Sequence, residues 1–178
     1  MTNTIFKKLI STTMACAGLF RFTGCANGQD ANKELEIKEI NMEVLQEMIA
    51  DKETFTLMVE RDNCPFCNSM NTYLEETKAD HKGQYNVYRL DTTDYELYRE
   101  AEGDMTLISS TEEGKQFLSI FPYFLYTPSI YKIEEGLPVD VGIGYDEANY
   151  TISNWNVDST INWEQARPID VWTYLAQE

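Results

Sequence analysis

At 178 residues the chain has room for one domain with short appendages, and a hydrophobic share of 43% is enough to build a core. Its 30 acidic residues against 14 lysines and arginines give a formal net charge of -16, so no nucleic-acid partner is expected to bind through a basic face. Beyond the N-terminal segment no apolar run is long enough to cross a bilayer, which excludes a multi-span membrane protein.

The N-terminus predicts an export signal. Lys7 and Lys8 form a basic region, and the mostly apolar run Leu9 to Phe20 that follows is too short to span a bilayer comfortably. We therefore expect residues 1–24 to be a lipoprotein-type signal peptide that is removed.

The segment Phe22-Thr23-Gly24-Cys25 resembles a bacterial lipobox, in which the cysteine becomes lipidated. Residues 25–34 are small and polar for the most part, as a flexible tether should be. The expected location is therefore outside the cytoplasm, with the protein anchored to the bacterial cell membrane through Cys25. The alternatives are secretion after an ordinary cleavage near Cys25, or an anchor that stays uncleaved.

Periodic patterns predict the elements of the following domain, 35–178. In chain order we expect a strand over 35–40, a helix over 41–49, a strand over 54–60, a helix over 68–76, a strand over 86–91, two helical segments between 92 and 121, and a hairpin with strands 129–133 and 139–143. A polar stretch follows over 146–164, and Pro168 is expected to open a last helix. Helices that alternate with early strands, followed by an antiparallel pair, predict an α/β fold with a central mixed sheet covered by helices on both faces.

The segment Cys64-Pro65-Phe66-Cys67 is the most informative feature of the chain. A predicted strand ends just before it and a predicted helix comes just after it, which places Cys64 at a helix N-terminus. There, unpaired N–H groups and the helix dipole favour a thiolate. Cysteines at this spacing can close a disulfide across one helical turn, and the second can resolve a mixed disulfide formed by the first. The pattern indicates thiol–disulfide exchange.

Two other interpretations of the cysteine pair stay open. Half of a zinc site would need further Cys or His ligands, and the only candidates are His81, Cys16 and Cys25. A static structural disulfide is also conceivable, although so short a ring adds little stability through chain entropy. We expect neither a metal nor an organic cofactor.

Three placed features resemble the thioredoxin superfamily. They are Cys64-Pro65-Phe66-Cys67 between the second strand and its helix, the order of strands and helices from about 35 to 177, and Thr127-Pro128 directly before the hairpin. The resemblance implies a three-layer thioredoxin-like fold with a central mixed sheet. It also implies that Pro128 is cis, lies beside the cysteines and exposes the preceding backbone to an extended substrate.

The expected roles at the site follow from this arrangement. Cys64 is the expected nucleophile, partly exposed, and Cys67 the buried resolving thiol. The four residues expected to contact substrate are Pro65, Phe66, Thr127 and Pro128.

More narrowly, the region from Asn41 to Tyr98 is similar to small Gram-positive proteins described as bacteriocin transport accessory proteins. The sequence also departs from thioredoxin, which has Trp where this chain has Asn63 and Gly-Pro between its cysteines. Thioredoxin buries an acid six residues before its first cysteine, and Met58 occupies that place here. The direction of electron flow is therefore left open.

The sequence thus predicts an exported, membrane-tethered thiol–disulfide oxidoreductase that acts on protein or peptide thiols and disulfides, with a membrane reductase or an exporter as a further candidate partner. The alternative is a non-catalytic thioredoxin-fold accessory module for a bacteriocin-type peptide exporter.

Overall fold

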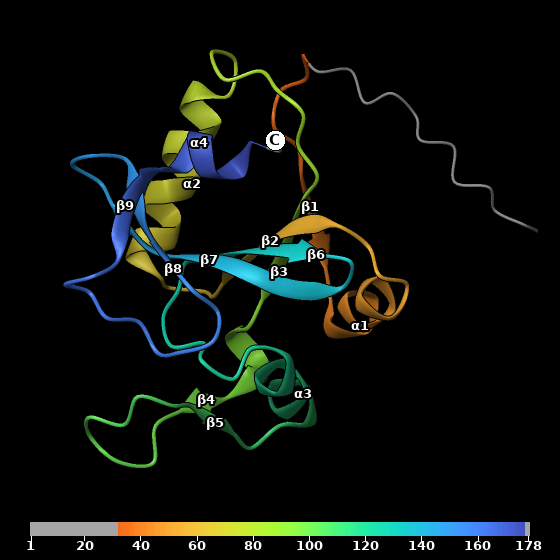
Figure 1. The fold of residues 1–178 in the computed structure, drawn as a ribbon, viewed down its shortest axis with the longest axis vertical. Coiled ribbons are helices and arrows are strands. Elements are labelled where there is room, and N and C mark those ends of the chain that lie inside the picture. Colours follow the sequence, from red (N-terminus) through yellow and green to blue (C-terminus); the bar gives the residue numbers. More distant parts are fainter. Residues whose placement is uncertain (1–31, 177–178) are drawn as a thin grey trace, which may run out of the picture.

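The computed structural model describes residues 32–176, and the predicted signal segment 1–24 and Cys25 lie outside this range. A seven-stranded mixed sheet forms the centre of the described part, with helices on both faces (Figure 1). Its strands are β1 (Ile37–Ile40), β2 (Phe55–Glu60), β3 (Val87–Asp91), β6 (Ser129–Glu134), β7 (Leu137–Asp146), β8 (Thr151–Trp155) and β9 (Arg167–Asp170). The helices are α1 (Met42–Ala50), α2 (Pro65–Thr77), α3 (Glu112–Ile120) and α4 (Val171–Leu175). The predicted α/β class is confirmed.

The sheet divides into a parallel part and an antiparallel part. Its strand order is β1-β3-β2-β6-β7-β8-β9. The first three strands in this order run parallel, and every neighbouring pair from β2–β6 onward is antiparallel. The change of direction occurs beside β2, the strand that leads into the cysteine pair.

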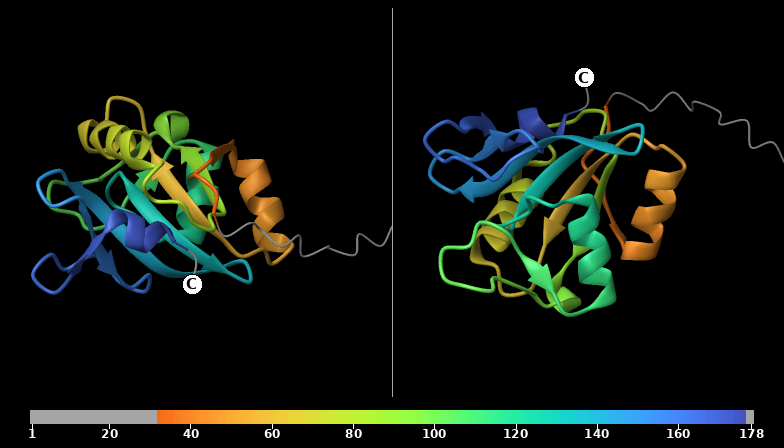
Figure 2. Two further views of the ribbon diagram at one scale, coloured as in Figure 1. Left: turned by 90° about the horizontal axis from the view of Figure 1, so that it is seen from above. Right: turned by 60° about the horizontal axis from the view of Figure 1, so that its bottom comes forward.

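Strand β2 is buried along its whole length because helices cover both faces of the sheet. Leu57 and Val59 pack in one cluster with residues of α1 and with Phe117 of α3. Met58 points to the other face, where it packs with residues of α2 and α4, including Met70. Figure 2 shows α1 and α3 together on the same side of the strands. The strand is thereby fixed on both faces, and so is the turn that follows it.

The region 92–111 differs from the prediction. The expected first helix, with Tyr95, Leu97 and Tyr98, is absent; a single 3-10 turn (Thr93–Tyr95) leads instead into a two-stranded pair, β4 (Leu97–Tyr98) and β5 (Ile108–Ser109). Glu96 has φ +46°, and a residue in the left-handed region cannot continue a helix. The expected second helix is confirmed as α3, capped by the Thr111 hydroxyl.

The region after 146 is also more regular than predicted. The polar stretch 146–164 contains β8, whose Ile152 is buried against α4. Pro168 lies in β9 rather than at a helix start, and α4 begins at Val171 after an Asp170 cap. Because β9 is the edge strand, the missing N–H of Pro168 removes no hydrogen bond from the interior of the sheet.

At the start of the described range, Lys33 pairs with Gly83 through two backbone hydrogen bonds of 3.2 and 2.9 Å. Backbone pairing therefore begins within the segment predicted as a tether, 25–34. Between residues 32 and 176, no helix combines the length and the apolar character that crossing a membrane requires.

Candidate active site

The turn between β2 and α2 presents the two cysteines. Cys64 is the N-cap of α2 with an extended backbone, φ −93° and ψ 106°, and its sulfur accepts a hydrogen bond from the Cys67 N–H at 3.2 Å. Pro65 occupies the first helical position, where the missing N–H costs no intrahelical bond. Asn63 adopts φ +55°, a conformation that asparagine tolerates better than most residues. The local sequence thus specifies this turn.

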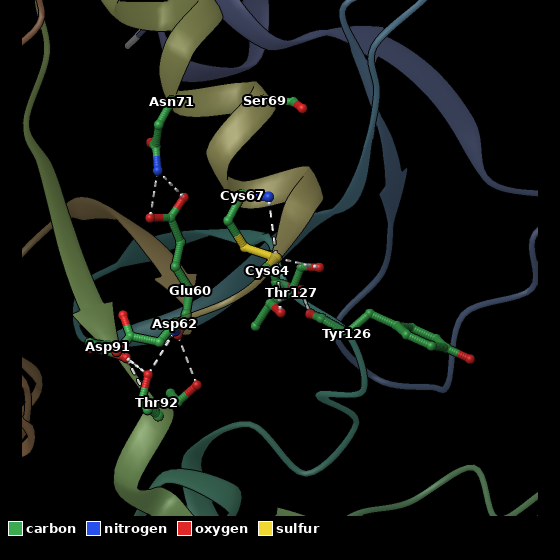
Figure 3. The surroundings of a disulfide bond; sticks show 12 residues. Glu60, Asp62, Cys64, Cys67, Ser69, Asn71, Asp91, Thr92, Tyr126 and Thr127 are labelled. Carbon is green, nitrogen blue, oxygen red and sulfur yellow. Dashed lines mark hydrogen bonds between the residues drawn. A yellow bond between two sulfur atoms is a disulfide. The ribbon is translucent and has the colours of Figure 1, made fainter.

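Cys64 and Cys67 form a disulfide, with their Cα atoms 5.3 Å apart, at the first turn of α2 (Figure 3). The expectation that Cys64 is partly exposed is corrected, because only 3% of it is accessible, against 2% of Cys67. Phe66 and Thr127 line the same groove as Cys64, and Thr127 contacts its sulfur directly. The two cysteines therefore differ in position rather than in burial, because Cys64 lines the groove and Cys67 does not.

Thr127 meets Cys64 from a segment 63 residues further along the chain. Its hydroxyl Oγ1 donates to Cys64 Sγ at 3.4 Å, and its carbonyl oxygen lies 3.5 Å from the same sulfur. The Thr127–Pro128 peptide bond is cis, as predicted. The predicted closeness of this dipeptide to the sulfur of Cys64 is also confirmed.

A groove of about 560 Å³ opens beside Cys64. The residues that line it come from four places in the chain: the end of β2 and start of α2 (Arg61, Cys64, Pro65 and Phe66), the turn after β3 (Thr92 and Thr93), the β4–β5 region (Glu96, Leu97, Tyr98, Arg99 and Leu107), and the segment before β6 (Phe124, Leu125, Tyr126 and Thr127).

Three of the four predicted substrate contacts line this groove, namely Pro65, Phe66 and Thr127. Phe66 is 52% exposed and projects as the prediction requires. The fourth, Pro128, is buried and is not among the lining residues, and its carbonyl accepts the Gly144 N–H at 2.8 Å. Its contact with substrate stays a prediction.

A cavity of similar size, about 570 Å³, lies at the far end of β2 around Thr54 and Lys132. It contains neither cysteine. We therefore place the candidate active site at the groove beside Cys64 rather than at the cavity around Thr54 and Lys132.

A buried acid lies beneath the start of α2, although not at position 58. Met58 is fully buried in the apolar core, and Glu60, on the same face of β2, is 6% exposed. The Glu60 carboxylate accepts two hydrogen bonds from Asn71 Nδ2 at 3.0 and 3.1 Å, and Arg89 Nε lies 2.8 Å from its Oε2. Desolvation raises the pKa of Glu60 above its ordinary value, against the hydrogen bonds of Asn71 and the charge of Arg89. Figure 3 shows the Glu60 side chain extending beside the disulfide toward Asn71.

Neither this buried network nor the role of the two arginines in the groove was predicted from the sequence. Arg61 could have been found from its nearness to Cys64 in the sequence, but Arg99 follows a strand of two residues that has no recognisable periodicity. Asn71 and Arg89 come to Glu60 from α2 and β3, so the network depends on the tertiary fold.

Within 32–176 no three His, Cys, Asp or Glu side chains are placed so that they could hold a metal ion. His81, the histidine considered as a zinc ligand, stacks on the Trp172 ring, with 4.7 Å between the ring centroids.

The fold and the site define an α/β protein with a disulfide at the N-terminal turn of the helix that follows its central strand. Among solved structures, similarity was found to thioredoxin f from spinach chloroplast in its short form, with 15% identity, a TM-score of 0.40, and coverage of 62% of this chain and 83% of that chain. It was also found to Malassezia sympodialis thioredoxin (Mala s 13), with 12% identity, a TM-score of 0.41, and coverage of 65% and 88%. No protein-family model and no curated protein matched the sequence. The function proposed next is derived from the geometry of the cysteine pair.

Proposed function

We propose that this protein is a thioredoxin-like thiol–disulfide oxidoreductase that acts on protein or peptide thiols and disulfides. The observation that carries the proposal is the Cys64–Cys67 disulfide, which closes the first turn of α2 with one of its sulfurs lining a groove. A disulfide between residues only three apart removes little entropy from the unfolded chain, so stability alone gives a weak reason for it.

The geometry supports a two-step exchange. In the reduced protein the Cys64 thiolate attacks one sulfur of a substrate disulfide; the substrate S–S bond breaks, one substrate thiolate leaves and a mixed disulfide forms. The Cys67 thiolate then attacks Cys64 Sγ, which breaks the mixed disulfide, releases the second substrate thiolate and closes Cys64–Cys67. Two electrons pass to the substrate, and the two protons of the protein thiols end on the products. The same steps in reverse oxidise a substrate dithiol.

Cys64 is the better nucleophile on three grounds. The Cys67 N–H and the Thr127 hydroxyl both donate to its sulfur, and both donors stabilise a thiolate there. Its position as N-cap adds the favourable field of the α2 N-terminus. It also lines the groove, whereas Cys67 does not.

The test is to trap the mixed disulfide. Reduced Cys67→Ser protein mixed with a peptide disulfide should accumulate a Cys64–peptide adduct that mass spectrometry detects and dithiothreitol reverses, whereas Cys64→Ser should form none. The double variant Cys64→Ser/Cys67→Ser measures the background from Cys16 and Cys25. If Cys67→Ser captures no peptide and the wild-type disulfide survives mild reductant, the disulfide is structural, and the non-catalytic accessory module for a peptide exporter becomes the better explanation.

We further propose that the protein works outside the cytoplasm, tethered through a lipid on Cys25. The lipobox-like segment that ends at Cys25 and the basic and apolar regions before it support this location. A disulfide is also more persistent in an oxidising compartment than in a cytoplasm.

A further inference from the structure

The groove beside Cys64 holds two guanidinium groups in an otherwise acidic chain. Arg61 and Arg99 both line it and both are exposed, although the chain carries a formal net charge of -16. Within residues 32–176 neither forms an ion pair, whereas Arg89, at the buried network, pairs with two carboxylates. Glu96 is the one acid among the groove-lining residues, and it accepts a hydrogen bond from the Ser110 hydroxyl.

The two arginines reach the groove from different parts of the chain, Arg61 from the end of β2 and Arg99 from the β4–β5 region. Arg61 precedes Cys64 by three residues. Arg99 lies over the ring of Tyr126, with its guanidinium carbon 5.4 Å from the ring centroid. Figure 3 shows that the Tyr126 ring points away from the disulfide. Two segments that are distant in the sequence therefore supply positive charge to the same groove.

Apolar surface accompanies these charges. Phe66 and Tyr98 line the groove and are 52% and 48% exposed. Exposed rings of this size next to guanidinium groups suit an extended polypeptide, because they can cover its apolar side chains while the planar fork of arginine pairs with a carboxylate in two hydrogen bonds.

We propose that the groove selects an extended polypeptide segment that carries an acidic side chain beside its reactive cysteine, with Arg61 and Arg99 as the residues that bind the carboxylate. This inference rests on the proposed oxidoreductase function and assigns its substrate class. The net negative charge of the protein repels such a segment at long range, but at physiological ionic strength this repulsion is screened beyond about 8 Å. The selection is therefore made in contact, inside the groove.

The test compares two peptide disulfides that differ only in the residue beside one cysteine, glutamate in one and glutamine in the other. The reduced full chain is mixed with each peptide, and the rate of peptide reduction is divided by the rate with dithiothreitol, which corrects for the intrinsic reactivity of each disulfide. The glutamate peptide should react about fivefold faster, the upper end for an exposed ion pair. Arg61→Ala and Arg99→Ala should each reduce the ratio, and the double variant should bring it to about one. Arg167→Ala, which removes an exposed arginine of β9 outside the groove, should leave it unchanged.

The outcomes separate the substrate class from the proposed function. Equal normalised rates for the two peptides, or a ratio that the double arginine variant does not lower, overturn the substrate class and leave the oxidoreductase standing. If glutathione disulfide is reduced as fast as the glutamate peptide, the proposal of an extended polypeptide segment is overturned. The groove would then select a small anionic disulfide. The proposed function itself is overturned if the protein reduces no disulfide faster than the Cys64→Ser/Cys67→Ser background. This comparison includes neutral hydroxyethyl disulfide.

Discussion

Thr127→Val tests the electrostatic basis of the proposed nucleophile. The substitution keeps the size of the side chain and removes the hydroxyl that donates to Cys64 Sγ at 3.4 Å. A hydrogen bond to a charged group contributes about 1.5 kcal/mol at the low end, and one pKa unit corresponds to about 1.4 kcal/mol, so the pKa of the Cys64 thiol should rise by about one unit. The direction is fixed, because the lost donor stabilised only the charged form.

The rate effect is smaller than the pKa effect. Below both pKa values a rise of one unit lowers the thiolate fraction about tenfold, while the more basic thiolate is about threefold more nucleophilic at a Brønsted coefficient near 0.45. At a pH below both values, alkylation of Cys64 should therefore slow by about threefold to fourfold.

The assay is alkylation of the reduced full chain by iodoacetamide across a pH series, with the modified cysteine identified by mass spectrometry. In the wild type, Cys64 should react at least about tenfold faster than Cys67, because Cys67 does not line the groove. Thr72→Val is the matched control: its hydroxyl donates to the Asn68 carbonyl on the same helix and does not contact the sulfur. An unchanged pH profile in Thr127→Val, or an equal shift in Thr72→Val, would refute the role of the Thr127 hydroxyl.

Three further predictions concern the core, the buried acid and the N-terminus. Phe117→Ala removes the ring that contacts Tyr95, Phe121 and Phe124, and should lower the free energy of unfolding in a urea titration by about 3 to 5 kcal/mol; a loss below about 1 kcal/mol contradicts the packing. Because burial raises the pKa of Glu60 in the folded state, the wild type should lose stability relative to Glu60→Gln as pH rises from the unfolded-state pKa through the folded-state pKa; a relative gain over that interval contradicts the shift. Fatty-acid labelling should mark the wild type and Cys16→Ser but not Cys25→Ser, and label retained in Cys25→Ser contradicts the lipid anchor.

The elements around the cysteine pair could be predicted because their signals are local. The apolar run before the cysteines, the proline at the first helical position and the asparagine cap of α1 each act within a few residues. The same holds for the β6–β7 hairpin, whose turn contains Gly136 at φ +77°. Such local patterns predict a helix, strand or turn independently of the residues that pack against it.

The β4–β5 region could not be predicted because its strands are two residues long. Tyr95 and Leu97 are buried or half-buried against the Phe117 cluster. Tyr95 and Tyr98, three residues apart, have the spacing of a helical face. The turn at Glu96 interrupts that face, and a single left-handed residue has no reliable sequence signal. As a result, the sequence pattern did not predict the part of the groove that contains Arg99.

The strands β8 and β9 were missed for a related reason. The five residues Thr151–Trp155 are rich in β-branched and aromatic types, but they sit within a polar stretch whose composition indicates a loop. These five residues extend the sheet because they pair with β7, which continues to Asp146.

The buried acid shows how a position-by-position resemblance can mislead about chemistry. Both oxygens of Glu60 are engaged, Oε1 by Asn71 and Oε2 by Asn71 and Arg89. Asn71 lies four residues after Cys67 on α2, so the carboxylate links the end of β2 to the first turns of the helix that presents both cysteines. A carboxylate with both oxygens held by these partners positions α2, and these partners disfavour an exchange of its proton with a thiol. Glu60→Gln should therefore alter the pH dependence of stability while leaving the alkylation rate of Cys64 near that of the wild type.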